Sequence, residues 1–156
     1  MTMVHPSDVQ DLLGRWWFEY DQGNFAAWGD CFTADAHFSC RSDSGHTAFE
    51  EFIRADVDGR DQVVEWQANH RRDSPYPLRH HATDVHLTSV GDDVADFRSY
   101  LLATQIVGGA VSNLATGLVV GTARVEQGTL RLADLRVILD FTDSEVFSAR
   151  ERQPAP

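Results

Sequence analysis

The first third of the chain carries apolar residues at helical spacing. Ser7 is typical of a helix N-cap, and apolar side chains then recur at three- and four-residue intervals over residues 9–20. Gly23 is expected to end this helix, and Asn24 to cap a second, short helix over residues 25–32.

The next segment is less regular. Residues 33–35 predict a turn, and residues 36–40 alternate as a short strand. A third helix is expected from about Thr47, with Phe49, Phe52 and Ile53 on its buried face. Residues 58–76 give no clear pattern.

After Pro77 the apolar period changes from helical spacing to two. Four strands are expected at residues 78–90, 94–107, 111–126 and 129–141, joined by turns that contain glycine. Gly117 and Gly121, inside the third of these strands, indicate bulges or the close approach of another backbone.

These elements predict one α+β domain over residues 1–147. In it, a long, curved antiparallel sheet forms a cone packed against three N-terminal helices. The polar residues 148–156 are expected to form a flexible tail.

Charge and composition limit which partners the protein can bind and indicate its cellular compartment. The net charge of -11 argues against binding to nucleic acid or an anionic membrane. No apolar run is long enough to span a membrane, and the start of the chain does not resemble a signal peptide. Two cysteines, Cys31 and Cys40, make no disulfide framework. We therefore expect a cytoplasmic protein.

The strand expected at residues 78–90 carries two adjacent histidines. Alternate residues share a face of a strand, so His81 lies with Val85 and Leu87, and His80 lies on the other face. The first face becomes apolar downstream, which predicts that His81 points inward and His80 outward. An inward imidazole can act as a general acid or base. The alternative is a hydrogen-bonded core histidine.

Tyr20 and Asp21 lie at the end of the first expected helix. Burial against the neighbouring tryptophans would suit the Asp21 carboxylate to proton abstraction, or it can orient His81 by accepting the ring hydrogen. Tyr20 can donate its hydroxyl to a substrate carbonyl or enolate. The alternatives are a solvated turn residue for Asp21 and a core aromatic for Tyr20.

Aromatic side chains are dense between residues 16 and 32, as in a packed core or a pocket for a flat cyclic ligand. The expected substrate-binding residues are Trp16, Trp17, Trp28, Phe32 and, on the third long strand, Asn113. The histidines and cysteines lack metal-ligand spacing, and the sequence has no nucleotide-binding motif. We therefore expect neither a metal nor another cofactor.

The order of these motifs resembles the cone-shaped superfamily named after nuclear transport factor two. The resemblance covers residues 9–142 and rests on the motifs at residues 20–25, 32–36 and 79–85. Within that superfamily, the chain is similar to the SnoaL-like branch, which includes polyketide cyclases and scytalone dehydratase.

This resemblance implies an acid–base site made of Tyr20, Asp21 and His81. The dehydratase also uses a second histidine on the third long strand, where this chain has no histidine over residues 112–115. We therefore expect a cofactor-independent dehydratase, isomerase or cyclase acting on a hydrophobic cyclic substrate, either polyketide- or steroid-like. His81 and Asp21 would abstract a proton, and Tyr20 would stabilise the enolate.

Other members of the superfamily imply different roles. One alternative is a ligand-binding domain without catalysis, and another is the small (beta) subunit of a ring-hydroxylating dioxygenase. The resemblance also implies a homodimer formed through the outer face of the sheet, with Leu102, Val119 and Ile138 as the expected apolar contacts.

Overall fold

The computed structural model describes residues 3–150 of the chain. Helices and strands follow in the order α1 (Pro6–Gln22), α2 (Phe25–Gly29), β1 (Phe32–Ser42), α3 (Glu50–Ile53), β2 (Ala55–Asp58), α4 (Arg60–Arg72), β3 (Leu78–Val90), β4 (Val94–Val107), β5 (Ala110–Glu126), β6 (Thr129–Leu139) and α5 (Phe147–Arg150).

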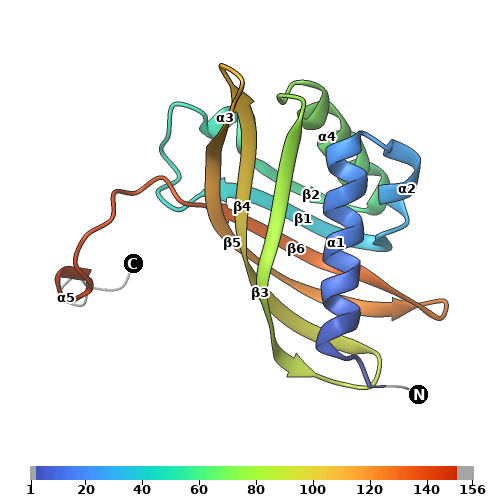
Figure 1. Cartoon of the computed structure of the whole chain (residues 1–156). Coiled ribbons are helices and arrows are strands. Elements are labelled where there is room, and N and C mark those ends of the chain that lie inside the picture. The colour runs from blue at the N-terminus through green and yellow to red at the C-terminus, as the bar shows by residue number, and fades with distance from the viewer. Residues whose placement is uncertain (1–2, 151–156) are drawn as a thin grey trace.

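The strands form one curved, open sheet in the order β2-β1-β6-β5-β4-β3 (Figure 1). All neighbouring strands run antiparallel except β1 and β6, which pair in parallel. Helix α1 lies against the concave side of the sheet next to β3 (Figure 1). The predicted α+β fold is confirmed, and the parallel pair is a feature that the sequence pattern did not predict.

Helix α1 begins two residues earlier than its pattern predicts. His5 is the N-cap, Pro6 takes the first helical position, and the Asp8 carboxylate accepts a hydrogen bond from the His5 backbone N–H at 2.9 Å. Gly23 ends the helix as predicted, with a φ of 69° in the left-handed region. These signals fix the end of α1, where Tyr20 and Asp21 lie.

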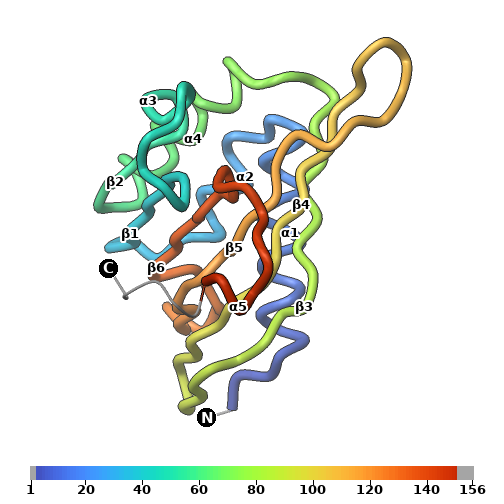
Figure 2. Tube along the Cα trace, turned by 90° about the vertical axis from the view of Figure 1, so that its left-hand side faces the viewer, coloured from blue at the N-terminus to red at the C-terminus, as the bar shows by residue number. Residues whose placement is uncertain are grey.

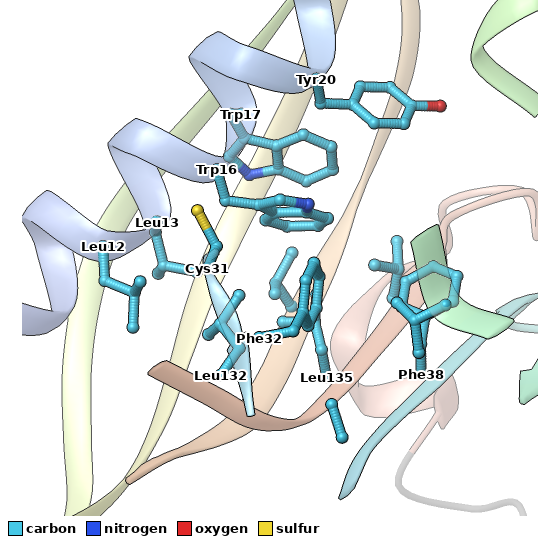
Figure 3. Packing of buried hydrophobic residues seen from close by; sticks show 14 of the residues in the cluster. Leu12, Leu13, Trp16, Trp17, Tyr20, Cys31, Phe32, Phe38, Leu132 and Leu135 are labelled. Carbon is cyan, nitrogen blue, oxygen red and sulfur yellow. The ribbon is translucent and has the colours of Figure 1, made fainter. Parts of the chain in front are cut away.

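The apolar face of α1 packs onto the sheet. Trp16, Trp17 and Tyr20 project from the helix into the buried apolar cluster that also contains Leu132 and Leu135 of β6 (Figure 3). Burial of these large side chains holds α1 in place, at roughly 1.5–3 kcal/mol for each aliphatic one.

Two glycines allow β5 to approach β6 closely. A Cβ on Gly117 would lie 2.4 Å from the Ile138 carbonyl oxygen, and a Cβ on Gly121 would lie 2.3 Å from that of Asp134. The close backbone approach predicted at both glycines is confirmed.

The four long strands match their predicted ranges within two residues, but the segment before them differs. The predicted turn at residues 33–35 belongs to β1, which spans eleven residues with an irregular register near its start. Helix α3 has only four residues, and Phe49 and Phe52 are exposed rather than buried. Residues 60–72, which gave no clear pattern, form α4.

The outer face of the sheet differs from its prediction at one residue. Leu102 and Ile138 lie on that face, but Val119 pairs with Ser99 and Val137 on the inner face and is fully buried. Val119 is therefore wrong as an outer contact, and Leu118 takes its place. In the tail predicted at residues 148–156, residues 148–150 complete α5, and residues 151–156 lie outside the described part.

Candidate active site

An aspartate from α1 and a histidine from β3 form a buried pair. Asp21 Oδ1 lies 2.6 Å from His80 Nδ1, and Asp21 Oδ2 accepts the His80 backbone N–H at 2.8 Å. The side chains of Asp21 and His80 are only 5% and 11% exposed. Because both carboxylate oxygens are used, Asp21 fixes the ring of His80 with the Nδ1 hydrogen toward the carboxylate and leaves Nε2 free to accept a proton.

Two further side chains hold this pair. The Trp17 ring stacks on the His80 imidazole at a centroid distance of 4.1 Å and an angle of 7°. The buried guanidinium of Arg71, on α4, donates to the backbone carbonyls of Tyr20 and Asp21 at the end of α1. Arg71 therefore adds donors at the last carbonyls of α1, of which that of Tyr20 also accepts the Gly23 N–H, and ties α4 to the helix end that carries Asp21.

The predicted orientation of the two histidines is wrong. His80 faces the interior, and His81 is exposed, with its ring 3.4 Å from the Thr104 hydroxyl. A β-bulge is the physical reason, because residues 84 and 85 lie opposite the single residue Ser99, and Asp84 has a φ of 54°. The extra residue reverses the alternation, so His80 shares a face with Val85 and Leu87.

His80 lines an apolar cavity of about 70 Å³ between α1, α4 and the concave side of the sheet. Its other lining residues come from six further elements and are Trp16, Trp17, Tyr20, Phe38, Cys40, Ile53, Trp66, Gln67, His70, Leu101, Val137 and Leu139. Most of these side chains are apolar, so proton transfer at His80 would take place largely shielded from water.

A second histidine reaches the cavity from α4. His70 Nδ1 lies 2.7 Å from the Tyr20 hydroxyl oxygen, and the His70 ring packs between Trp66 and Phe52. Burial raises the pKa of Tyr20, so its phenol keeps its proton. Burial, and then the nearby His80, lower the pKa of His70 to about 4, so its imidazole is neutral at pH 7.

His70 is the site residue that sequence reasoning missed. The signal was present but weak: Val63, Gln67 and His70 or Arg71 recur at helical spacing within residues 60–72. Two of the four buried residues of this helix, Gln67 and Arg71, are polar, which weakens the apolar periodicity.

The predicted substrate-binding residues divide into two groups. Trp16 and Trp17 line the cavity. Trp28 and Phe32 are fully buried in the core and do not line it, and Asn113 is exposed on β5. Asn113 lies four residues beyond Gly109, close to the tip of the β4–β5 hairpin, which projects past the rest of the sheet (Figure 2).

The described part of the chain has neither a metal-ligand cluster nor a helix suited to span a membrane. No group of three or more His, Cys, Asp or Glu side chains in residues 3–150 is arranged to hold a metal ion. In the same range, no helix is long and apolar enough to cross a membrane.

The family model of the SnoaL-like domain matches residues 6–136. The chain belongs to the SnoaL-like family. The SnoaL-like match spans every element that carries the Asp21–His80 pair and most of the strands around the cavity. The comparison with curated proteins gives no match.

Solved structures share the fold of this SnoaL-like chain. An NTF2-like protein with a cystatin-like fold from Novosphingobium aromaticivorans is 17% identical, with a TM-score of 0.69 and coverage of 94% of this chain and 88% of that one. A candidate scytalone dehydratase from the same organism is 15% identical, with a TM-score of 0.69 and coverage of 90% and 87%. The beta subunit of benzoate 1,2-dioxygenase from Burkholderia mallei is 21% identical, with a TM-score of 0.68 and coverage of 89% and 93%.

Proposed function

We propose that this SnoaL-like protein is a cofactor-independent dehydratase, isomerase or cyclase that moves a proton next to the carbonyl group of a compact cyclic substrate. The observation that carries the proposal is the 2.6 Å contact between Asp21 and His80 at the wall of an apolar cavity. The catalytic role that the sequence suggested for His81 belongs, in this proposal, to His80.

The proposed chemistry follows from the orientation of the pair. His80 Nε2 removes a proton from the carbon beside the carbonyl, and the C–H electron pair becomes the new C=C bond while charge moves to oxygen. Asp21 stabilises the resulting imidazolium through Nδ1. Return of the proton to another carbon of the enolate gives an isomerase. In a dehydratase, the enolate re-forms its carbonyl as the C–O bond to a β-hydroxyl group breaks, and the hydroxyl takes the proton from His80 and leaves as water. General acid–base catalysis of this kind contributes about 10²- to 10⁴-fold.

The size of the cavity limits the size of the substrate that can bind in it. A volume of about 70 Å³ is several times the ~10–15 Å³ needed for one water, but it is far below the roughly 300–1,000 Å³ of pockets for drug-sized ligands. A ligand with one ring suits this space better than the steroid-like ligand expected from the sequence.

Hydrogen–deuterium exchange tests the proposal directly. The protein is incubated in D₂O with cyclohexanone, cyclohex-2-enone and a steroid ketone, and loss of the α-proton signal is followed by ¹H NMR. We expect the wild-type protein to exchange the α-protons of a one-ring ketone faster than buffer alone does. His80→Gln should lose this acceleration, and His81→Gln should keep it. Exchange that is equal with and without protein, or unchanged in His80→Gln, would reject the proposal.

A second function, assembly with another chain, is favoured by the outer face of the sheet. Tyr100, Leu118 and Ile138 form a row across β4, β5 and β6, and Tyr100 and Leu118 are 60% and 39% exposed. Apolar rows of this kind suit an interface, either in a homodimer or with an oxygenase subunit. Light scattering of the wild type and of Tyr100→Arg tests the homodimer, and a monomer mass for the wild type would count against it.

A further inference from the structure

Three side chains that line the cavity carry buried nitrogen atoms without hydrogen-bond partners. Among its lining residues, Trp17 Nε1, Gln67 Nε2 and His70 Nε2 are buried from solvent and unpaired. An unpaired buried polar group costs roughly 1–3 kcal/mol, so each of these atoms is a place where a ligand atom would be stabilising. Two of them, on Gln67 and His70, lie one turn apart on the same side of α4.

Partners on α1 fix the orientation of both α4 side chains. Gln67 Oε1 accepts the Trp16 Nε1–H at 3.2 Å, which leaves the NH₂ end of the Gln67 amide as the free end. The Tyr20 hydroxyl oxygen lies 2.7 Å from His70 Nδ1. We assign the protonated phenol as the donor in this contact, which places the ring hydrogen of the neutral imidazole on Nε2. Both free groups are therefore hydrogen-bond donors.

The two donors and the proposed base belong to one cavity but come from different elements. His80, on β3, offers an acceptor at Nε2, while Gln67 and His70 offer only donors. His80 lies close enough to His70 for their charges to repel when both are protonated. This arrangement suits one small ligand that has a C–H group at one end, toward the base, and an oxygen at the other, toward the donors.

We propose that His70 Nε2–H and Gln67 Nε2–H together bind the carbonyl oxygen of the substrate, whose negative charge grows as His80 removes the neighbouring proton. This inference rests on the proposed function and adds the residues that recognise the oxygen. Donors aimed at an oxygen where charge develops stabilise the transition state more than the ground state. The site selects a one-ring ligand with an acceptor oxygen, and phenols are the matching analogues of the enolate.

Tyr20 takes a positioning role in this arrangement. Its hydroxyl is bonded to His70, so it acts on the substrate through the imidazole rather than directly. The prediction that Tyr20 donates to the enolate is replaced here by donation from His70.

Two probes of similar size test the inference without any turnover. 4-Fluorophenol carries an oxygen, and 4-fluorotoluene has a methyl group in its place. Their binding to the whole chain is measured by ¹⁹F NMR titration for the wild type, His70→Asn and His70→Gln. Asn keeps an acceptor for Tyr20 near the Nδ1 position but has no donor near Nε2, whereas Gln places a donor near Nε2.

We expect the wild type to bind 4-fluorophenol at least tenfold more tightly than 4-fluorotoluene. His70→Asn should lose most of that preference, and His70→Gln should keep more of it than His70→Asn. In ¹⁵N-histidine-labelled wild type, the His70 Nε2–H signal should move downfield when 4-fluorophenol is added, and this readout needs no variant. A role of His70 in packing alone would not produce that shift.

Several outcomes would overturn the inference. These are equal binding of the two probes, a preference that survives in His70→Asn, an unmoved His70 signal, or no binding of either probe. The proposed function can fail separately from this inference. A His70-dependent preference without ketone exchange would reject proton transfer and keep the oxygen site. Ketone exchange without the preference would keep proton transfer and reject the oxygen site.

Discussion

His80 Nδ1 lies 2.6 Å from Asp21 Oδ1, and the backbone N–H of the same histidine donates to the second oxygen of the same carboxylate. This double contact fixes both the position and the tautomer of the imidazole. Substitutions can therefore test the two side chains separately. A change at Asp21 can alter the tautomer of His80 while the imidazole stays in place, and a change at His80 removes the imidazole while the carboxylate stays.

Asp21→Asn should reverse the tautomer of His80. The amide NH₂ donates to Nδ1, which places the imidazole hydrogen on Nε2 and removes the acceptor to which we assign proton removal. We expect ketone exchange to fall by about 10²- to 10⁴-fold, with the unfolding midpoint changed little. The ¹⁵N shifts of His80 report the tautomer, and an Asp21→Asn protein with full activity and a protonated Nε2 would contradict this role.

His80 and His81 form a matched pair for mutation. His80→Asn removes a buried ring that stacks on Trp17, and His81→Asn changes an exposed ring. The first should abolish ketone exchange, and the second should leave it within about twofold of the wild type. Equal losses in the two variants would mean that the bulge at Asp84 does not set their orientation.

As the pH is lowered below 6.5, the free energy of unfolding should decrease more steeply in the wild type than in His70→Asn. The pKa of His70 is lowered from 6.5 to about 4 in the folded chain, so below pH 6.5 the unfolded chain binds the extra proton. His70 therefore lowers the free energy of unfolding as pH falls from 6.5 to 4, by on the order of 2 kcal/mol. Urea titrations of both proteins at pH 7, 5.5 and 4.5 measure the difference.

In both the wild type and His70→Asn, His37 changes the free energy of unfolding with pH in the opposite direction to His70. Its ring lies 2.8 Å from Asp56 and 2.7 Å from Asp134, and these carboxylates raise the pKa of His37. The stabilisation it contributes is present below pH 6.5 and is lost as pH rises through its folded pKa. Because this contribution is common to both proteins, it cancels in their difference. Parallel pH profiles for the wild type and His70→Asn would contradict the burial of a neutral His70.

Gly121→Ala should destabilise the fold, and Gly14→Ala should not. The added Cβ at Gly121 would lie 2.3 Å from the Asp134 carbonyl oxygen and 2.9 Å from the Phe97 ring, whereas no atom lies within 4 Å at Gly14. We expect Gly121→Ala to cost at least about 1–3 kcal/mol and Gly14→Ala to stabilise by roughly 0.4–1 kcal/mol. Urea denaturation measures both, and a neutral Gly121→Ala would show that β5 and β6 separate readily.

Both thiols should be unreactive in the folded protein. Cys31 and Cys40 are free and buried, and burial, with a smaller effect of Glu50, raises the pKa of Cys40 to about 12. Ellman's reagent at pH 8 should therefore label neither cysteine until urea unfolds the chain. Rapid labelling of Cys40 without urea would indicate that the cavity opens to solvent.

The strands and the first helix were predictable because their signals are local. The end of α1 at Gly23 and the four long strands follow from residue type and from periods of 3.6 and 2, which hold over ten or more neighbouring residues. Tyr20 and Asp21 were found for the same reason, since they lie at a helix end that the sequence marks.

The orientation of the histidines and the contents of the cavity were decided by the tertiary structure. One extra residue in β3 exchanges the faces of His80 and His81, and it is recognised only from the register with β4, where residues 84 and 85 lie opposite the single residue Ser99. The roles of His70 and Gln67 depend on partners about fifty residues away on α1, and the weak helical spacing within residues 60–72 does not reveal those partners. The sequence alone determined α1 and the four long strands, because the signals for these elements lie in neighbouring residues, but it did not reveal α4. Which side chains meet depends on strand register and on buried polar contacts between distant segments, and these exist only once the sheet has curved around α1.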